Sequence, residues 1–230
     1  MSDTRAKLHL EQAVNIPSGN VNLEGELKVP QGANGVVLFA HGSGSSRHSP
    51  RNQYVARTIR ESGVGTLLFD LLTKEEEAVD AYTGELRFNI KFLAERLVDA
   101  TKWITGQAAT KHLRMGYFGS STGAAAALIA AVELRDVVAA VVSRGGRPDL
   151  AGEALPKVKA PTLLIVGGDD DVVIGLNEDA YAQLSCEKEL KIVPGATHLF
   201  EEPGTLEQVA HLASDWFKNR LQPLASAQTR

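Results

Sequence analysis

Residues 116–123 read GYFGSSTG, and this stretch decides the fold. An apolar run precedes it, and four alanines at 124–127 follow it. Gly119, Ser121 and Gly123 match the pattern Gly-x-Ser-x-Gly, in which the glycines let a strand and a helix approach closely around a serine in a strained turn. We therefore expect a buried strand, a sharp turn at Ser121 and then a helix. The plainer interpretation is a tight connection that small residues fill.

The rest of the chain predicts an α/β protein. Residues 8–16 and 21–29 alternate apolar and polar side chains around a Pro-Ser-Gly-Asn turn, which predicts an antiparallel hairpin. Beyond residue 34, continuous apolar runs alternate with amphipathic helices, a pattern typical of a mostly parallel sheet of about eight strands with helices on both faces. We expect one domain over 1–230, with a frayed tail at about 221–230. The further strands are expected at 35–42, 64–70, 113–119, 137–143, 161–168 and 189–195, and the helices at 50–62, 87–105, 122–134, 177–185 and 205–220.

A serine hydroxyl needs a base to become a nucleophile, and the base needs an acid to orient it. In this architecture the expected chain order is serine, then aspartate or glutamate, then histidine. Aspartates at 169–171 follow one expected strand, and His198 follows the next one. We assign Ser121 as nucleophile, His198 as base and Asp170 as acid, with Asp171 as the alternative acid.

Two backbone amides are expected to form an oxyanion hole. Thr122 follows the nucleophile at the start of a helix, where the helix dipole favours negative charge. The second amide is expected from Ser43, in the glycine-rich loop HGSGS at 41–45. The competing interpretation of this loop is a phosphate cradle, but the Lys-Ser/Thr pair of a P-loop and the third glycine of a dinucleotide fingerprint are missing.

With these residues placed, the chain resembles an α/β-hydrolase of the dienelactone-hydrolase-like group over nearly its whole length. The resemblance implies a Ser121–His198–Asp170 triad, an oxyanion hole at Ser43 and Thr122, no cofactor, no metal and no large cap domain. Dienelactone hydrolases proper resemble this fold but carry cysteine at the nucleophile position. The serine therefore favours a carboxylesterase acting on esters, with lactones or small anionic esters among the candidate substrates. An acyltransferase or thioesterase would use the same triad, and a non-catalytic binding protein is the non-enzyme alternative.

Basic residues near the expected strand ends are candidates for substrate binding. They could hold a substrate carboxylate through paired hydrogen bonds. The alternative is that they form salt bridges with Asp70, Asp149 or the acidic run at 75–77. The candidates are Arg47, His48, Arg51, Arg144 and Arg147.

Composition narrows the class of protein. A formal net charge of −4 gives no basic excess for nucleic-acid binding. No apolar run approaches the roughly 18–20 residues that span a bilayer, and the charged N-terminal residues lack the apolar core of a signal peptide. One cysteine, Cys186, leaves no partner for an intramolecular disulfide. We expect a cytoplasmic protein whose partner is a small-molecule ester, without a nucleic-acid or membrane partner.

Overall fold

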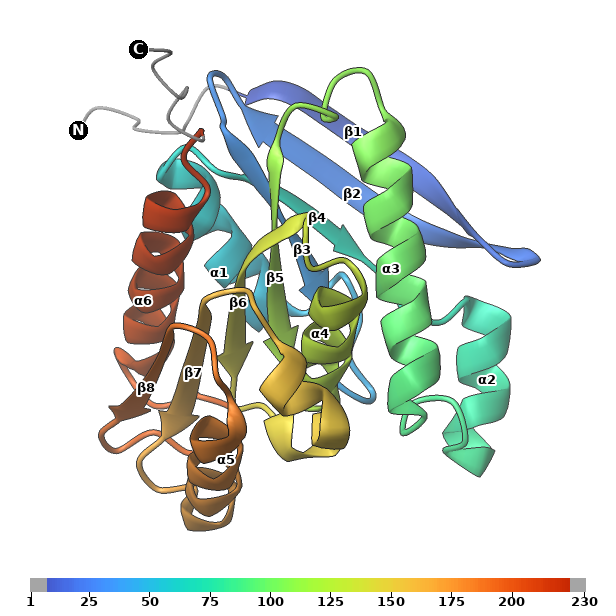
Figure 1. Ribbon diagram of the computed structural model, residues 1–230. Coiled ribbons are helices and arrows are strands. Elements are labelled where there is room, and N and C mark those ends of the chain that lie inside the picture. Colours follow the sequence, from blue (N-terminus) through green and yellow to red (C-terminus); the bar gives the residue numbers. More distant parts are fainter. Residues whose placement is uncertain (1–7, 224–230) are drawn as a thin grey trace.

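The computed structural model describes residues 8–223, whose eight strands form one sheet (Figure 1). The strand order is β1-β2-β4-β3-β5-β6-β7-β8. β2 pairs antiparallel with both β1 and β4, and every later pair is parallel. The predicted mostly parallel sheet with an N-terminal hairpin is therefore confirmed. The bounds are β1 Leu8–Ser18, β2 Val21–Pro30, β3 Gly35–Ala40, β4 Gly65–Phe69, β5 Arg114–Ser120, β6 Val138–Arg144, β7 Thr162–Gly167 and β8 Lys188–Val193.

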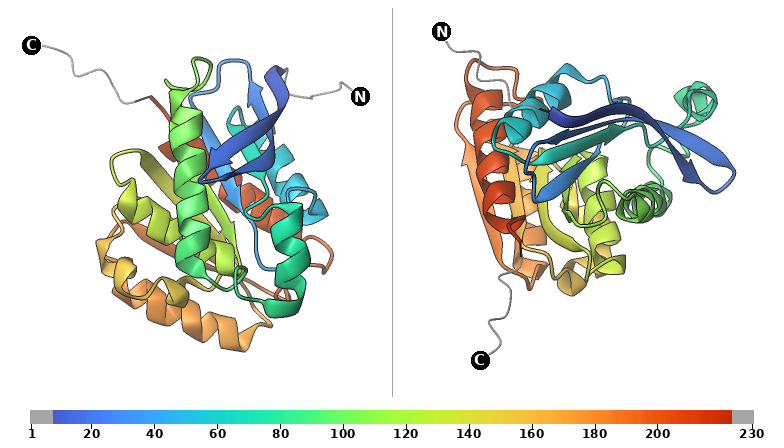
Figure 2. Two further views of the ribbon diagram at one scale, coloured as in Figure 1. Left: turned by 90° about the vertical axis from the view of Figure 1, so that its right-hand side faces the viewer. Right: turned by 90° about the horizontal axis from the view of Figure 1, so that it is seen from above.

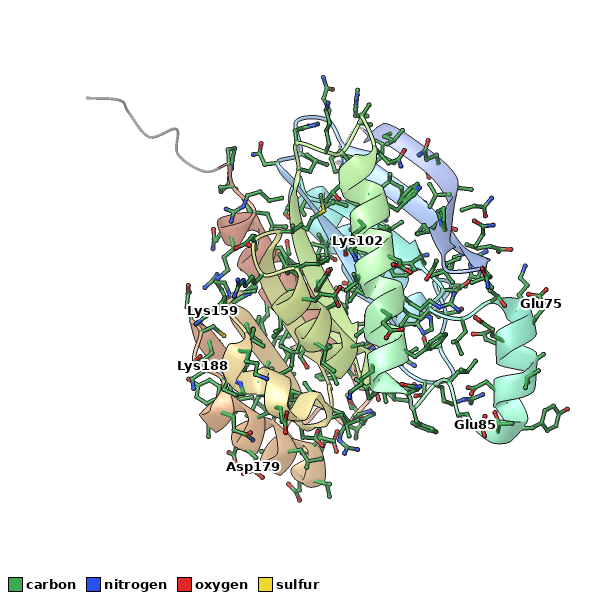
Figure 3. The ribbon with its side chains drawn as sticks, turned by 45° about the vertical axis from the view of Figure 1, so that its right-hand side comes forward. Glu75, Glu85, Lys102, Lys159, Asp179 and Lys188 are labelled. Atoms are coloured by element: carbon green, nitrogen blue, oxygen red, sulfur yellow. The ribbon has the colours of Figure 1, made fainter. Side chains whose placement is uncertain are left out.

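Helices cover both faces of this sheet (Figure 2). α1 and α6 pack on one face, whereas α3, α4, α5 and the 3₁₀ segment η1 pack on the other. α2 stands beside α3 at the margin of the molecule, between the labelled Glu75 and Glu85 in Figure 3. The bounds are α1 Pro50–Glu61, α2 Lys74–Thr83, α3 Ile90–Gly106, α4 Thr122–Glu133, η1 Pro148–Lys157, α5 Asp171–Gln183 and α6 Thr205–Arg220.

The central strands are apolar on both faces because each face meets a helical layer. In β3, Val37 and Phe39 point toward α1 and α6, and Leu38 points toward α3 and α4. Phe39 packs against Phe118 of β5 with ring centroids 4.8 Å apart. Burying each such side chain contributes about 1.5–3 kcal/mol. This packing makes the sheet a rigid support for the loops at its carboxyl edge.

The charged stretch after β4 forms α2, a helix that was not expected. Thr73 caps it, with its hydroxyl accepting the amide of Glu76 at 3.2 Å while the Glu76 carboxylate accepts the amide of Thr73 at 2.8 Å. Asp80 is the only buried residue that the helix carries. Capping and tertiary anchoring, rather than an apolar stripe, define α2, so apolar periodicity does not reveal it.

Two further segments differ from expectation. α5 begins at Asp171 rather than at residue 177, so only the three residues 168–170 separate β7 from this helix. Residues 148–157 form η1, a 3₁₀ segment broken at Gly152, whose φ is 50°. The break at Gly152, together with Pro156, which has no N–H to donate inside the segment, keeps η1 from becoming a regular α-helix.

The two described ends of the chain both lie at the amino edge of the sheet. Leu8 opens β1 opposite Pro30, just before β3 begins. At the other end, the Gln222 carbonyl accepts a hydrogen bond from Arg114 Nη1 at 3.0 Å, at the start of β5. The tail expected at about 221–230 lies outside the described residues from residue 224 onward.

Candidate active site

Ser121 lies at a sharp turn between β5 and α4, as the Gly-x-Ser-x-Gly pattern predicts. Its φ is 49° and its ψ −124°, a conformation that is strained for any residue with a Cβ. The flanking glycines are needed for space: a Cβ on Gly123 would lie 2.7 Å from the carbonyl carbon of Ala40, and one on Gly119 would lie 2.7 Å from the amide nitrogen of Ala124. The turn therefore holds the serine at the carboxyl edge of the sheet.

Asp170 and His198 meet at the same edge. His198 Nδ1 lies 2.7 Å from Asp170 Oδ2, so Nδ1 carries a proton for the carboxylate and Nε2 keeps its lone pair. Asp170 precedes α5 without capping it through its side chain, which leaves the carboxylate to the imidazole. The loops after β7 and β8 are joined by the Asp169 amide, which donates to the Ala196 carbonyl at 2.9 Å. Asp171, the alternative acid, is exposed in the first turn of α5.

The loop after β6 connects the serine to the histidine. The Ser121 carbonyl accepts the Arg147 amide at 3.0 Å on one side of this loop. On the other side, a Cβ on Gly145 would lie 3.0 Å from the His198 carbonyl and 3.7 Å from its ring carbon Cε1. Ser121 and His198 thus both border the segment Gly145–Arg147.

The loop after β3 packs against the serine turn. A Cβ on Gly42 would lie 2.8 Å from Ser121 Cβ, and the Ser43 and Thr122 hydroxyls are 3.1 Å apart. Ser43 Oγ also donates to the Arg87 carbonyl at 3.2 Å. Thr122 is the first residue of α4, where helix geometry leaves amides without a carbonyl partner. The two expected oxyanion-hole residues therefore lie side by side.

A cavity of about 270 Å³ opens beside this loop. The sequence analysis missed the part of its wall that α2 and the following turn supply. The local signals of α2 are the Thr73-x-x-Glu76 capping box, an acidic first turn and Gly84 at its end, and the helix has no apolar stripe. Glu77 faces the cavity, and partial burial raises the pKa of its carboxyl, assisted by the negative charge of Asp70. Besides Glu77, the lining residues are His41, Gly42, Ser43, Gly44, Ser45, Leu71, Leu72, Asp80, Ala81, Arg87 and Leu93.

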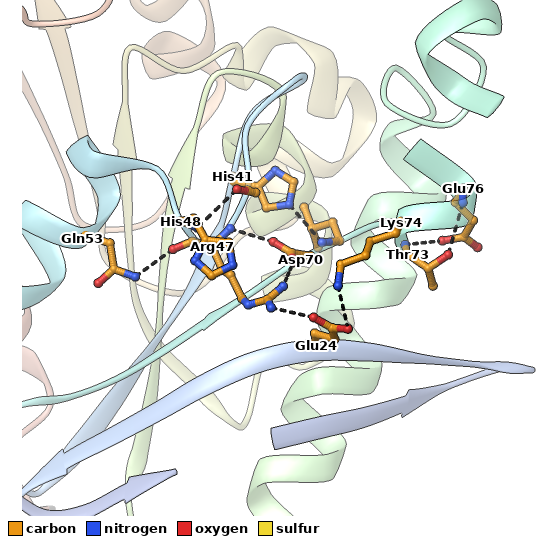
Figure 4. A network of polar contacts seen from close by, with 11 residues as sticks. Glu24, His41, Arg47, His48, Gln53, Asp70, Thr73, Lys74 and Glu76 are labelled. Atoms are coloured by element: carbon orange, nitrogen blue, oxygen red, sulfur yellow. Dashed lines mark hydrogen bonds and ion pairs between the residues drawn. The ribbon is translucent and has the colours of Figure 1, made fainter. Parts of the chain in front are cut away.

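His41 was not a candidate in the sequence analysis, yet its ring is buried at the end of β3, with 7% of the residue exposed. Its Nε2 accepts the Leu71 amide at 3.0 Å, and its Nδ1 lies 3.0 Å from the Gly42 carbonyl (Figure 4). Burial lowers the pKa of this imidazole, partly offset by its hydrogen bond to Gly42 and by the charge of Asp70. His41 directly precedes the predicted oxyanion-hole loop, and that position in the sequence could have suggested a role for it. Its hydrogen bonds to Leu71 and Gly42 are visible only in the fold.

Two of the five basic candidates pair with the aspartates that the salt-bridge alternative names, Asp70 and Asp149. Arg47 pairs with Asp70 and, at 2.5 Å, with Glu24 (Figure 4). Arg147 makes two hydrogen bonds to Asp149, at 2.9 and 2.8 Å.

The other three candidates lie elsewhere around the edge. Arg51 pairs with Glu201 at 3.1 Å, and His48 is exposed. Arg144 ends β6 with only 7% of its surface exposed, and within residues 8–223 it has no ion pair. Burial, with a smaller effect from the nearby Arg51, lowers the pKa of Arg144 to about 10.

Between residues 8 and 223 there is no cluster of three or more histidine, cysteine, aspartate or glutamate side chains placed to hold a metal ion. No helix in that range is both long and apolar enough to cross a bilayer.

Two solved structures are similar to this chain over nearly its whole length. A crystal structure of a dienelactone hydrolase from Anabaena variabilis is 60% identical, covers 93% of this chain and 99% of its own, and superposes with a TM-score of 0.91. Est1E from Butyrivibrio proteoclasticus shares the fold at 15% identity, with a TM-score of 0.76 over 90% of this chain and 98% of its own.

The curated relatives are longer proteins. One from Mycobacterium tuberculosis, which carries the name phosphoribosyl transferase, is 57% identical over 211 residues. Those residues are 92% of this chain and 47% of the relative, so the chain spans about half the length of that relative. The family model named Dienelactone hydrolase family matches residues 23–225. This chain therefore belongs to the Dienelactone hydrolase family.

Proposed function

We propose that this protein is a serine hydrolase that cleaves carboxylic esters through an acyl-enzyme. The observation that carries the proposal is the backbone of Ser121, whose φ of 49° is a strained conformation that a serine in an ordinary turn has no need to adopt. Membership in a hydrolase family and the 2.7 Å contact between His198 and Asp170 support the same function.

In the first step His198 Nε2 takes the proton of the Ser121 hydroxyl while Oγ attacks the ester carbonyl. Asp170 holds the proton on Nδ1 and stabilises the imidazolium that forms. The negative charge that develops on the carbonyl oxygen would be met by the amides of Ser43 and Thr122. Loss of one such donor in other enzymes lowers kcat by about 10²–10³.

The imidazolium of His198 then donates its proton to the leaving alkoxide, and the C–O bond breaks. This leaves the acyl group on Ser121 and releases the alcohol. A water molecule repeats the sequence: His198 takes its proton, the hydroxide attacks the acyl carbon, and the returning proton restores the serine. The carboxylic acid leaves, and the enzyme is regenerated.

The cavity beside Ser43 is the proposed site for one side of the substrate. Its volume of about 270 Å³ is suited to a small group, since drug-sized ligands need about 300–1,000 Å³. On the side of the substrate away from this cavity we propose an anionic substituent, whose charge would be balanced by the buried Arg144. Replacing Arg144 by glutamine should then lower kcat/KM about tenfold for an anionic ester and much less for a neutral ester of equal size. Equal losses on both esters would contradict this subsite.

The transferase name of the Mycobacterium tuberculosis relatives raises a second candidate function, but no feature of this site favours it. The match covers less than half of that relative. The loop Gly42–Ser45 forms a turn packed on the serine, and the sequence 41–50 contains no lysine of the kind that a P-loop uses to bind a phosphate. We therefore propose that the portion shared with those relatives is their hydrolase portion.

Labelling with a fluorophosphonate tests the nucleophile. Wild type and Ser120→Ala should be labelled, because Ser120 belongs to β5 and precedes the turn, whereas Ser121→Ala should not be. A panel of esters, lactones and thioesters should then show turnover, and added alcohols or amines should leave the acid as the main product. Labelling that persists in Ser121→Ala would contradict the proposal, and a main product that carries the added alcohol would identify an acyltransferase.

A further inference from the structure

The hydrogen bonds of His41 determine where its proton lies. The Leu71 amide lies 3.0 Å from Nε2, and because a main-chain N–H can only donate, Nε2 must be the acceptor. Nε2 therefore carries a lone pair, and the proton of the neutral ring is on Nδ1. That proton is donated to the carbonyl of Gly42, 3.0 Å away.

This carbonyl belongs to the peptide that contains the Ser43 amide. In a trans peptide the C=O and N–H groups point in opposite directions within one plane, so fixing one fixes the other. The Gly42 carbonyl accepts a second hydrogen bond from the Ser45 amide at 3.1 Å, which closes a turn that needs Gly44 at a φ of 68°. With two donors on the carbonyl, the Ser43 amide has one orientation.

The Ser43 amide is free for a substrate. Ser43 lies in a turn, and its amide donates to no backbone carbonyl within residues 8–223. Its neighbour Gly42 packs on Ser121, and the Ser43 hydroxyl lies 3.1 Å from that of Thr122. The peptide between Gly42 and Ser43 therefore lies over the start of α4, next to the proposed nucleophile.

We propose that His41 is a positioning residue: by donating from Nδ1 to the Gly42 carbonyl, it holds the Ser43 amide in the direction from which that amide stabilises the oxyanion. The inference rests on the proposed function, because it assigns His41 a part in catalysis by Ser121. The hydrogen bond also polarises the peptide, which strengthens the Ser43 N–H as a donor.

The surroundings of His41 keep its ring neutral. Burial disfavours the imidazolium, while the hydrogen bond to Gly42 and the charge of Asp70 oppose that effect only in part. Asp70 is itself paired with Arg47. The remaining charged groups that line the same cavity are Glu77, Asp80 and Arg87, of which the last two pair with each other. A protonated His41 would present an N–H to the Leu71 amide and lose that contact.

The alternative is a purely structural role, in which His41 only fastens the β3 loop to Leu71. Two substitutions separate these roles. Asparagine places an amide near the position of Nδ1 and can still donate to Gly42, but it does not reach Leu71. Glutamine places its amide near Nε2 and can still accept from Leu71, but it leaves Gly42 without this donor.

Steady-state hydrolysis of p-nitrophenyl acetate by the full chain tests the proposal. We expect His41→Gln to lower kcat by about 10- to 100-fold with little change in KM, since the effect falls on the transition state. His41→Asn should retain kcat within about fivefold of wild type, even if its thermal midpoint is the lower of the two. His211→Gln, an exposed histidine on α6, is the matched control and should behave as wild type. A kcat that falls more in His41→Asn than in His41→Gln would overturn the proposal in favour of the structural role.

A second measurement is independent of activity. Nitrogen-15 NMR of the histidine side chains, with the His41 signals identified by their loss in His41→Asn, should show a neutral ring protonated at Nδ1. Protonation at Nε2 would overturn the proposal whatever the kinetics. If wild type hydrolyses none of the esters, lactones or thioesters, the proposed function fails instead, and the NMR result still reports on the His41 contact.

Discussion

At the scale of single residues, the turn at Ser121 depends on Gly123 as much as on the serine, because a side chain at position 123 would not fit. A methyl group on Gly123 would meet main-chain atoms of Ala40 and His41, which cannot move without displacing β3. We expect Gly123→Ala to lower the free energy of unfolding by about 1–3 kcal/mol and to abolish most ester turnover. Urea titration and kcat measure the two effects.

The control for this substitution is Gly175→Ala on α5. Apart from its chain neighbours and the backbone of its own helix, no atom lies within 4 Å of the position a Cβ would take there. That substitution should raise the free energy of unfolding by about 0.5–1 kcal/mol and leave turnover unchanged. If Gly123→Ala and Gly175→Ala destabilised the protein equally, the effect would not come from the close packing at Gly123, and the packing argument would fail.

The two adjacent aspartates should differ sharply in function. Asp170 contacts His198, and Asp171 is exposed in the first turn of α5. We expect Asp170→Asn to lower kcat by about 10⁴, because the amide favours the wrong tautomer of the imidazole. Asp171→Asn should change kcat by less than about threefold and lose only a few tenths of a kcal/mol from the helix dipole. A larger loss in Asp171→Asn would make it the acid instead.

The buried His41 should make stability depend on pH in a predictable direction. Its pKa is lowered in the folded protein, so below the ordinary value of about 6.5 the unfolded chain takes up a proton that the folded chain refuses. Stability is therefore full above this value and falls as pH decreases, by up to about 1.4 kcal/mol per pH unit until the folded pKa is reached. His41→Asn lacks this dependence, so urea titrations should show its stability deficit narrowing between pH 7.5 and 5. A constant deficit would contradict the burial argument.

At the scale of secondary-structure elements, α2 is the segment most weakly tied to the core. It buries Asp80, whose carboxylate accepts the Leu86 amide at 2.6 Å, and its start depends on the capping box of Thr73. Thr73→Ala should cost about 1 kcal/mol locally and speed hydrogen exchange in α2 more than in α3. Since Glu77 and Ala81 line the cavity, KM should rise more than kcat falls.

The control is Thr83→Ala, at the exposed end of α2. It should change neither the hydrogen exchange of α2 nor KM, and a matching change there would rule out the cap as the cause.

The elements also show which parts of the structure local sequence can predict. Strand ends, glycines and chain order are local signals, so the turn at Ser121 and the nearness of Asp170 to His198 follow from them. The carboxylates that hold Arg47 come from β2 and the end of β4, strands that only the sheet brings together. Pairings of that kind depend on tertiary packing, and for the same reason the helix anchored by Asp80 escaped prediction.

At the scale of the whole molecule, one sheet separates two apolar layers, and each contains one of the two tryptophans. Trp103 packs with the layer of α3, and Trp216 with that of α6. Alternate residues of each central strand belong to opposite layers, so neither layer can lose its packing while the other persists. We expect Trp103→Phe and Trp216→Phe, each leaving one fluorescent reporter, to unfold in urea as single transitions, each coinciding with the loss of circular dichroism of the same variant. A fluorescence transition that precedes the circular dichroism change in either variant would show that the layers unfold separately.

The position of the two described ends, both at the amino edge of the sheet, has a consequence for larger assemblies. Leu8 lies opposite Pro30 and Gln222 contacts Arg114 at the start of β5, whereas Ser121, Asp170 and His198 follow the ends of β5, β7 and β8. A protein joined genetically directly before Leu8 or directly after Pro223 would thus be attached on the side remote from the serine. Fusion through a short linker should leave the mouth of the site open, so the fold is suited to being carried as one module of a longer polypeptide.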